Sequence, residues 1–197
     1  MRRQTTALVM AGVTAAAVLT GATVSNAASG PSAAAHHPTS SSATAAAKTI
    51  SLRLRPSSPE LAACFPNARS RVRVALTTDA IGKDTFWIRA SGLKRRTAYT
   101  VFLIQKAGTP FGAVEYIGDI TTNRYGHARN RFSLIVEEAF AFNNETQVRK
   151  ELNSVGFWFA DPKDDNGCLG AGSPVTQFDG DASAGVQMMN SGVHKLP

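Results

Sequence analysis

The sequence predicts an all-β fold, an antiparallel β-sandwich of about seven strands with one short helix. In residues 49–55 apolar and polar side chains alternate with a period of two, the pattern of a half-buried strand. Other short runs are rich in Val, Ile, Phe and Tyr, and Gly, Pro, Asn or Asp bounds each of them, as turns bound strands. The predicted strands are residues 49–55, 71–76, 85–89, 99–105, 113–121, 128–136 and 155–160.

One segment has the pattern of a helix. The run from Asn144 to Gln147 has the layout of a capping box, which satisfies the first backbone amides of a helix. Glu145 and Arg149 stand four residues apart, as paired charges on a helix do. We therefore expect a short helix here. Residues 139–142, just before it, could extend either the preceding strand or the helix, because periodicity alone does not decide.

The first 27 residues have the layout of a cleavable secretory signal. Arg2 and Arg3 give a positive start, an uncharged apolar stretch follows, and Ser25 and Ala27 are small residues at the expected cleavage site, as a signal peptidase requires. The apolar stretch is interrupted and falls short of the roughly 20 residues that span a bilayer. We therefore expect a secreted, extracellular protein whose mature form has no membrane span.

The next block, residues 28–48, is composed mainly of Ala, Ser, Thr and Pro. This composition cannot bury enough apolar surface to offset the entropy of ordering the chain, so we expect a flexible spacer. Residues 49–197 then form a single domain. The formal charge is +7, and loss of the two charges of Arg2 and Arg3 would leave +5. Such a charge favours anionic partners, and it equally serves solubility.

The chain has two cysteines, Cys64 and Cys168. An oxidising extracellular compartment allows them to pair, and we expect one disulfide. A metal-thiolate pair or a catalytic thiol would need a Cys-x-x-Cys motif or a neighbouring histidine, and neither is present.

Residues 92–101 carry Leu93, Thr97 and Tyr99 in a spacing that resembles the tyrosine corner of fibronectin type III and related immunoglobulin-like domains. In those domains a tyrosine at the start of a strand hydrogen-bonds back to the chain. The resemblance implies an immunoglobulin-like β-sandwich. The mature sequence also resembles small secreted proteins of high-GC Gram-positive bacteria, which implies no particular activity.

Both cysteines lie in predicted loops, so their disulfide would tie loops together rather than cross the core.

No complete catalytic set is present in the sequence. His127 is the one histidine in the body of the predicted domain, beside a glycine at a strand start, where a turn residue is expected. Two carboxylate pairs remain. Glu137 and Glu138 are adjacent at a strand end, while Glu115 and Asp119 are an even number of residues apart in one predicted strand and would share a face. A glycoside hydrolase needs two acids that face one sugar, so a small carboxylate-dependent hydrolase stays open as an alternative.

Two acidic loops could hold calcium. Residues 161–167 gather three aspartates and an asparagine, while Asp179, Asp181 and Ser183 offer oxygens at positions one, three and five of a loop, the hard ligands that Ca²⁺ prefers. Ala184 stands where an EF-hand requires glycine, and the same residue types are usual in plain turns. No other cofactor is expected.

Arginines at alternate positions of three predicted strands indicate a basic surface. Alternate residues of a strand project from one face, so neighbouring strands would join these arginines into a stripe. They could equally be the polar half of half-buried strands. The pairs are Arg53 with Arg55, Arg71 with Arg73, and Arg129 with Arg131.

Trp87 and Trp158 each lie between two apolar neighbours. If those neighbours point inward, both indoles face outward and could stack on a sugar ring or anchor a partner. A strand covered on both faces would bury them instead.

These features predict a secreted, noncatalytic binding module for an anionic polymer, a glycan or an extracellular protein. Nucleic acid is not the expected physiological partner. The first alternative is an inhibitor of an extracellular hydrolase, which would present the disulfide-held segments 57–67 or 161–174 as a rigid loop. The carboxylate-dependent hydrolase is the second.

Overall fold

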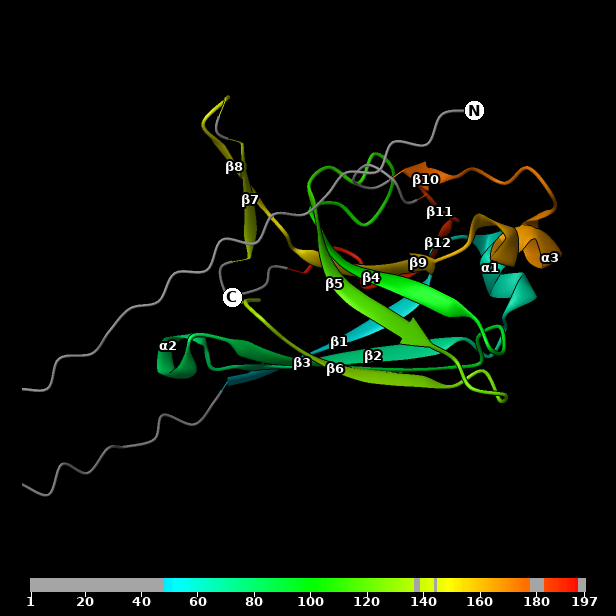
Figure 1. The fold of residues 1–197 in the computed structure, drawn as a ribbon, viewed down its shortest axis with the longest axis horizontal. Coiled ribbons are helices and arrows are strands. Elements are labelled where there is room, and N and C mark those ends of the chain that lie inside the picture. Colours follow the sequence, from blue (N-terminus) through cyan, green and yellow to red (C-terminus); the bar gives the residue numbers. More distant parts are fainter. Residues whose placement is uncertain (1–47, 137–138, 144, 178–182, 195–197) are drawn as a thin grey trace, which may run out of the picture. The chain divides into compact units, whose positions relative to one another are not determined.

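The computed structural model describes residues 48–136, 139–143, 145–177 and 183–194. The fold is mostly antiparallel β, with a large, nearly closed sheet of eight strands (Figure 1). The strands are β1 (Lys48–Pro56), β2 (Arg69–Leu76), β3 (Asp84–Ser91), β4 (Ala98–Ile104), β5 (Val114–Thr121), β6 (Ala128–Leu134), β9 (Ser154–Phe159) and β12 (Gln187–Asn190). Their order across the sheet is β5-β4-β9-β12-β1-β2-β3-β6.

The sheet consists of two four-stranded halves that face each other in Figure 1. Strands β1, β2, β3 and β6 form the half drawn below, and β5, β4, β9 and β12 form the half above it. The halves are joined where Arg55 pairs with Asn190 and Pro56 with Met189. At the other edge the side-chain amide of Asn130 donates to the Asp119 carbonyl at 2.9 Å. The sheet therefore nearly closes on itself.

The core lies between the two halves. In β2 and β3 the even-numbered residues, such as Val72 and Phe86, are buried, while most odd-numbered residues are exposed. Strand β9 differs, because every one of its residues is buried. A second cluster of Phe102, Ile104 and Trp158 covers the outer side of this half. Among the described residues, the outer side chains of the lower half are therefore largely exposed, whereas those at the centre of the upper half are buried.

Each of the seven predicted strands is present, and no end differs from the prediction by more than two residues. An eighth strand of the large sheet, β12, was not predicted. The remaining elements are short: α1 (Pro59–Cys64), α2 (Thr78–Ile81), β7 (Phe140–Asn143), β8 (Val148–Glu151), η1 (Pro162–Asp165), α3 (Asn166–Leu169), β10 (Thr176–Gln177) and β11 (Ser183–Ala184). None of the helices in these described segments is long and apolar enough to cross a membrane.

The helix predicted after residue 143 is wrong, because β7 and β8 form an antiparallel hairpin there. The Asn143 side chain accepts a hydrogen bond from the Thr146 amide at 2.7 Å, and Gln147 has a φ of 55°. Asn readily closes a turn in this way. The Arg149 side chain pairs with Glu151 on its own strand and lies over the Phe140 ring. Residues 145–147, which in sequence look like part of a helix cap, therefore lie in the turn of a hairpin.

The predicted disulfide is present and joins Cys64 to Cys168, with Cα atoms 5.8 Å apart. It connects the end of α1 to α3. Helix α1 begins where the Ser58 hydroxyl accepts a hydrogen bond from the Leu61 amide, and Leu61 anchors it in the core. The bridge thus fastens two short helices through cysteines that lie 104 residues apart in sequence.

Replacing both cysteines with serine is expected to lower the free energy of unfolding by about 2–4 kcal/mol, because the unfolded chain gains the freedom of a long open loop. Urea titration followed by far-UV circular dichroism measures the difference. Reduction of the wild-type protein should give a similar loss. Equal stability of the double variant and the oxidised wild type would contradict this expectation.

Tyr99, the residue of the predicted tyrosine corner, lies near the start of β4. Its ring is buried against Phe157 and Phe159. This burial raises the pKa of the Tyr99 hydroxyl well above its usual value, because the charged form is disfavoured away from water. Tyr99 is therefore a neutral core residue at any physiological pH.

Candidate binding face

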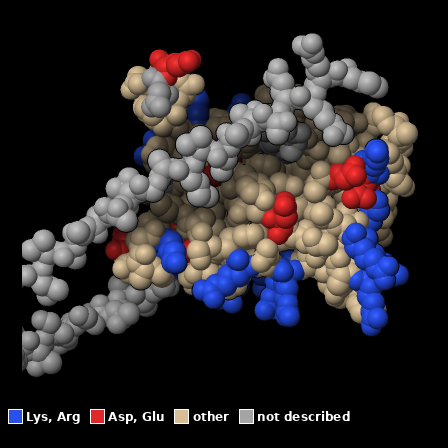
Figure 2. Space-filling view, viewed as in Figure 1, with Lys and Arg blue, Asp and Glu red and all other residues tan. Residues whose placement is uncertain are grey.

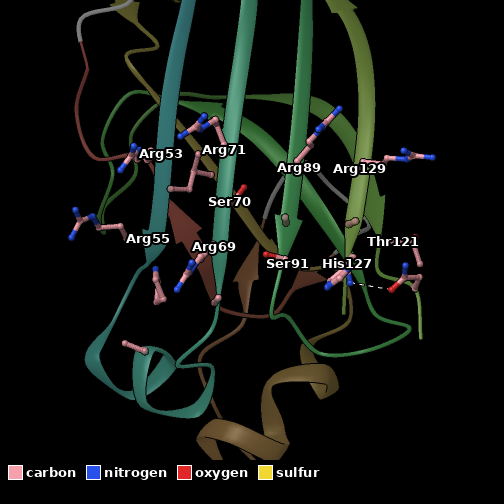
Figure 3. Close-up of a pocket in the computed structure, with 17 residues that line it drawn as sticks. Arg53, Arg55, Arg69, Ser70, Arg71, Arg89, Ser91, Thr121, His127 and Arg129 are labelled. Atoms are coloured by element: carbon pink, nitrogen blue, oxygen red, sulfur yellow. Dashed lines mark hydrogen bonds between the residues drawn. The ribbon is translucent and has the colours of Figure 1, made fainter. Parts of the chain in front are cut away.

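Four arginines stand in one row across the lower half of the sheet. The β1–β2 pairing sets Arg53 opposite Arg71. The next two pairings set Arg71 opposite Arg89, and Arg89 opposite Arg129. All four side chains are exposed, and Figure 3 shows them at one level on adjacent strands. Because neighbouring strands lie about 4.8 Å apart, the row presents four closely spaced guanidinium groups.

A second row lies two residues further along the strands. Here Arg73 is opposite Trp87, and Trp87 is opposite Arg131. The Arg131 guanidinium lies 5.6 Å from the centre of the Trp87 ring, a cation–π distance. On the other side of the first row, Figure 3 shows Arg55 and Arg69 near the strand ends. We call this outer surface of β1, β2, β3 and β6 the basic face; it comprises Arg53, Arg55, Arg69, Arg71, Arg73, Arg89, Arg129, Arg131 and Trp87.

No acidic side chain neutralises the basic face within the described part of the chain. The one acidic residue in its four strands is Asp84, which is buried. The ion pairs among the described residues are Lys94 with Asp164 and Arg149 with Glu151, and neither includes an arginine of the face. In Figure 2 blue side chains project along the lower margin, where this half of the sheet lies. Opposed like charges destabilise a sheet, so an anionic ligand would relieve the repulsion.

Two hollows share the basic face. The larger has a volume of about 1300 Å³ and is lined by six of the arginines, with His127 and Ser91 at its end. The smaller, of about 510 Å³, contains Trp87 and Arg73. Arg71 and Arg89 line both. Neither hollow has an acidic residue in its lining, so both suit negatively charged groups.

The structure brings all three predicted arginine pairs onto this one surface. Sequence reasoning missed Arg69 and Arg89, which complete it. Arg69 continues the alternation of Arg71 and Arg73, but it lies before the predicted start of the strand. Arg89 has the strand parity of Trp87 and could have been assigned to the same face from that spacing.

The two tryptophans have different environments. Trp87 is 36% exposed on the basic face, whereas Trp158 is 0% exposed. The Trp158 ring lies against Phe102 and Phe111 with ring centroids 5.4 and 5.0 Å away. Of the two alternatives for Trp158, the outward platform is therefore wrong and burial on a strand covered on both faces is correct, because residues around the β4–β5 connection cover that side of β9.

The carboxylate pair Glu115 and Asp119 does not share a face. Glu115 is opposite Leu103, and Asp119 is opposite Thr100, because a β-bulge shifts the register between them. A bulge of this kind reverses the alternation of side chains along a strand. Partial burial raises the pKa of Glu115. The predicted common parity is therefore wrong, and these two acids cannot flank one sugar. Glu137 and Glu138 lie outside the described residues.

The calcium prediction falls mainly outside the described residues. Only Ser183 of its three predicted ligands is described, and Asp179 and Asp181 are not. In the other acidic loop each carboxylate has its own partner. Asp161 accepts from the Lys163 amide, and Asp164 pairs with Lys94. Asp165 is buried and accepts from the Val186 amide at 2.9 Å. Among the described residues no three acidic, His or Cys side chains gather into a metal site.

Comparison of the sequence with protein-family models and with curated proteins finds no match. The candidate site therefore rests on the geometry of β1, β2, β3 and β6. Its defining property is the set of eight exposed arginines without neighbouring acids. Negative charge on a ligand would complement this surface.

Proposed function

We propose that the protein is an exported, noncatalytic binding module that holds an anionic polymer on the basic face. The observation that carries the proposal is the row of Arg53, Arg71, Arg89 and Arg129, which pairs like charges directly across three strand interfaces. If the outer surface only had to be polar, threonine at these positions would give a more stable sheet than arginine, because threonine favours strands and carries no charge. The repulsion between the arginines is offset when an anion lies over them.

The size of the surface supports a polymer rather than a single small anion. Three strand intervals of about 4.8 Å give the row a length of about 14 Å. The second row, with Arg73 and Arg131, begins about 7 Å further along the strands. A chain of repeated negative charges can engage several of these groups at once. Guanidinium groups hold carboxylate, sulfate or phosphate oxygens through two parallel hydrogen bonds, and both rows use arginine for this purpose.

Export and the finer fold assignment belong to the same proposal. The signal-like residues 1–27 support export. The two facing four-stranded halves support an immunoglobulin-like sandwich. An extracellular location would place the basic face among wall polymers and acidic glycans.

Replacing Arg71 and Arg89 with alanine tests the proposal, since both side chains line both hollows. We expect the double variant to bind polyanions at least about tenfold more weakly, a loss of about 1.4 kcal/mol or more. The binding of polygalacturonate, long-chain polyphosphate and single-stranded oligo-dT is measured at low and at high salt. The wild type should bind with a strong dependence on salt, and the variant with a weaker one.

The matched control replaces Lys106 and Lys150 with alanine. Both are exposed and lie outside β1, β2, β3 and β6, so this variant loses the same charge while keeping the basic face. It should bind as the wild type does. Without ligand at low salt, the arginine variant should melt at the same temperature as the wild type or higher, because repulsion is removed. Equal loss in both variants, or no binding by the wild type, would refute the basic face as a polymer site.

A further inference from the structure

Trp87 and its neighbours form a distinct part of the basic face. The smaller hollow combines the indole with Arg71, Arg73 and Arg89. Small side chains, Thr49 and Ala75, form the rest of its lining. Trp87 is the one aromatic side chain on the outer face of these four strands in the described chain. The hollow thus offers one flat apolar surface enclosed by cations.

Two arginines flank the indole across the strands. Arg73 and Arg131 are its direct cross-strand partners, and the Arg131 guanidinium covers part of the ring. Direct cross-strand side chains begin about 5 Å apart. A group stacked on Trp87 therefore lies within reach of at least two guanidinium groups. The site suits a ligand unit in which a ring and an anion are joined closely.

We infer that the Trp87 hollow is a sugar-ring subsite and that the polymer is an acidic polysaccharide. This inference rests on the proposed function. In an acidic polysaccharide each charged unit carries its carboxylate or sulfate on a pyranose ring, so a single tryptophan with flanking arginines contacts both parts of one unit. Inorganic polyphosphate has the charge but no ring. Single-stranded nucleic acid is held by aromatic platforms for successive bases, whereas this face has one.

Three probes separate these chemistries: polygalacturonate, polyphosphate of matched charge, and oligo-dT. We expect wild-type protein to bind polygalacturonate more tightly than the other two at equal salt. Trp87→Ala should weaken polygalacturonate binding by about tenfold and polyphosphate binding by less than about twofold. Trp87→Phe keeps a ring and should recover most of the loss. Fully methyl-esterified polygalacturonate keeps the rings without the charge, and it should bind far more weakly than polygalacturonate itself.

The outcomes distinguish this inference from the proposed function. If polygalacturonate and polyphosphate bind equally well and Trp87→Ala changes neither, the basic face is a polyanion site and the sugar subsite is refuted. If oligo-dT binds most tightly and depends on Trp87, the polymer is nucleic acid and the inference is refuted. If none of the probes binds to the wild type, both proposals fail. Trp87→Ala should retain wild-type unfolding behaviour, which excludes a folding defect as the cause of any loss.

Discussion

Replacing Trp158 with alanine is expected to lower the free energy of unfolding by about 3–5 kcal/mol. The indole is 0% exposed and makes edge-to-face contacts with Phe102 and Phe111. Ala184 also belongs to this cluster. Removal of the ring leaves a cavity between β9 and the β4–β5 connection, because strands of the large sheet cannot collapse into it. Urea titration followed by far-UV circular dichroism measures the loss.

Trp87→Ala is the matched control, because Trp87 is the other tryptophan of the chain and is 36% exposed. Its replacement should change the free energy of unfolding by less than about 1 kcal/mol. Each single variant keeps one tryptophan, so fluorescence reports each environment separately. The protein that retains Trp158 should emit at the shorter wavelength. Equal stability losses in the two variants would contradict the assigned burial.

The strands of the lower half could be predicted because their sequence pattern is local. In β2 one face packs on the core and the other meets solvent, so Val72 and Val74 alternate with arginines. Strand β12 has no such pattern, since Gln187, Met188 and Met189 are all buried. Partners from both sides of the strand bury these residues, and their identity is set by the tertiary fold. The sequence of a four-residue strand does not contain that information.

The same distinction explains which parts of the basic face could be predicted. Two arginines on one strand share a face by periodicity alone, as Arg71 and Arg73 do. The position of Arg89 opposite Arg129 depends on β3 lying beside β6, although β4 and β5 separate the two strands in sequence. The bulge in β5 is also invisible to a count of alternate residues, and it places Glu115 and Asp119 on opposite faces. Local sequence patterns encode neither which strands are neighbours nor the register between them. The first determines that Arg89 lies opposite Arg129, and the second separates Glu115 from Asp119.

Asp84→Ala is expected to lower the free energy of unfolding by about 3 kcal/mol or more, because it leaves one buried and two partly buried backbone amides without their acceptor. Asp84 is 0% exposed. One carboxylate oxygen accepts from the amides of Thr77 and Thr78 at 2.7 and 3.0 Å. The other accepts from the Val136 amide at 2.8 Å. One side chain thereby fastens the turn after β2 to the chain that follows β6. Thermal and urea unfolding measure the loss.

Asp84→Asn separates the hydrogen bonds from the charge. The amide keeps one acceptor oxygen for Thr77 and Thr78, but its NH₂ group would face the Val136 amide, donor against donor. This variant should fall between wild type and Asp84→Ala. Asp79→Ala, an exposed change in α2, is the control and should cost less than about 0.5 kcal/mol. A cost for Asp84→Ala no larger than that of Asp79→Ala would contradict the role given to the buried carboxylate.

The Asp84 variants also separate the fold from the binding contacts. Asp84 begins β3, the strand that carries Trp87 and Arg89, yet its own side chain is buried and is absent from the lining of both hollows. At a temperature where Asp84→Asn is still folded, it should therefore bind polyanions with wild-type affinity. Arg71→Ala with Arg89→Ala should show the opposite behaviour, with weak binding by a stable fold. These two patterns together would establish that the guanidinium groups act as ligands, since a purely structural role for the arginines predicts that binding and stability fall together.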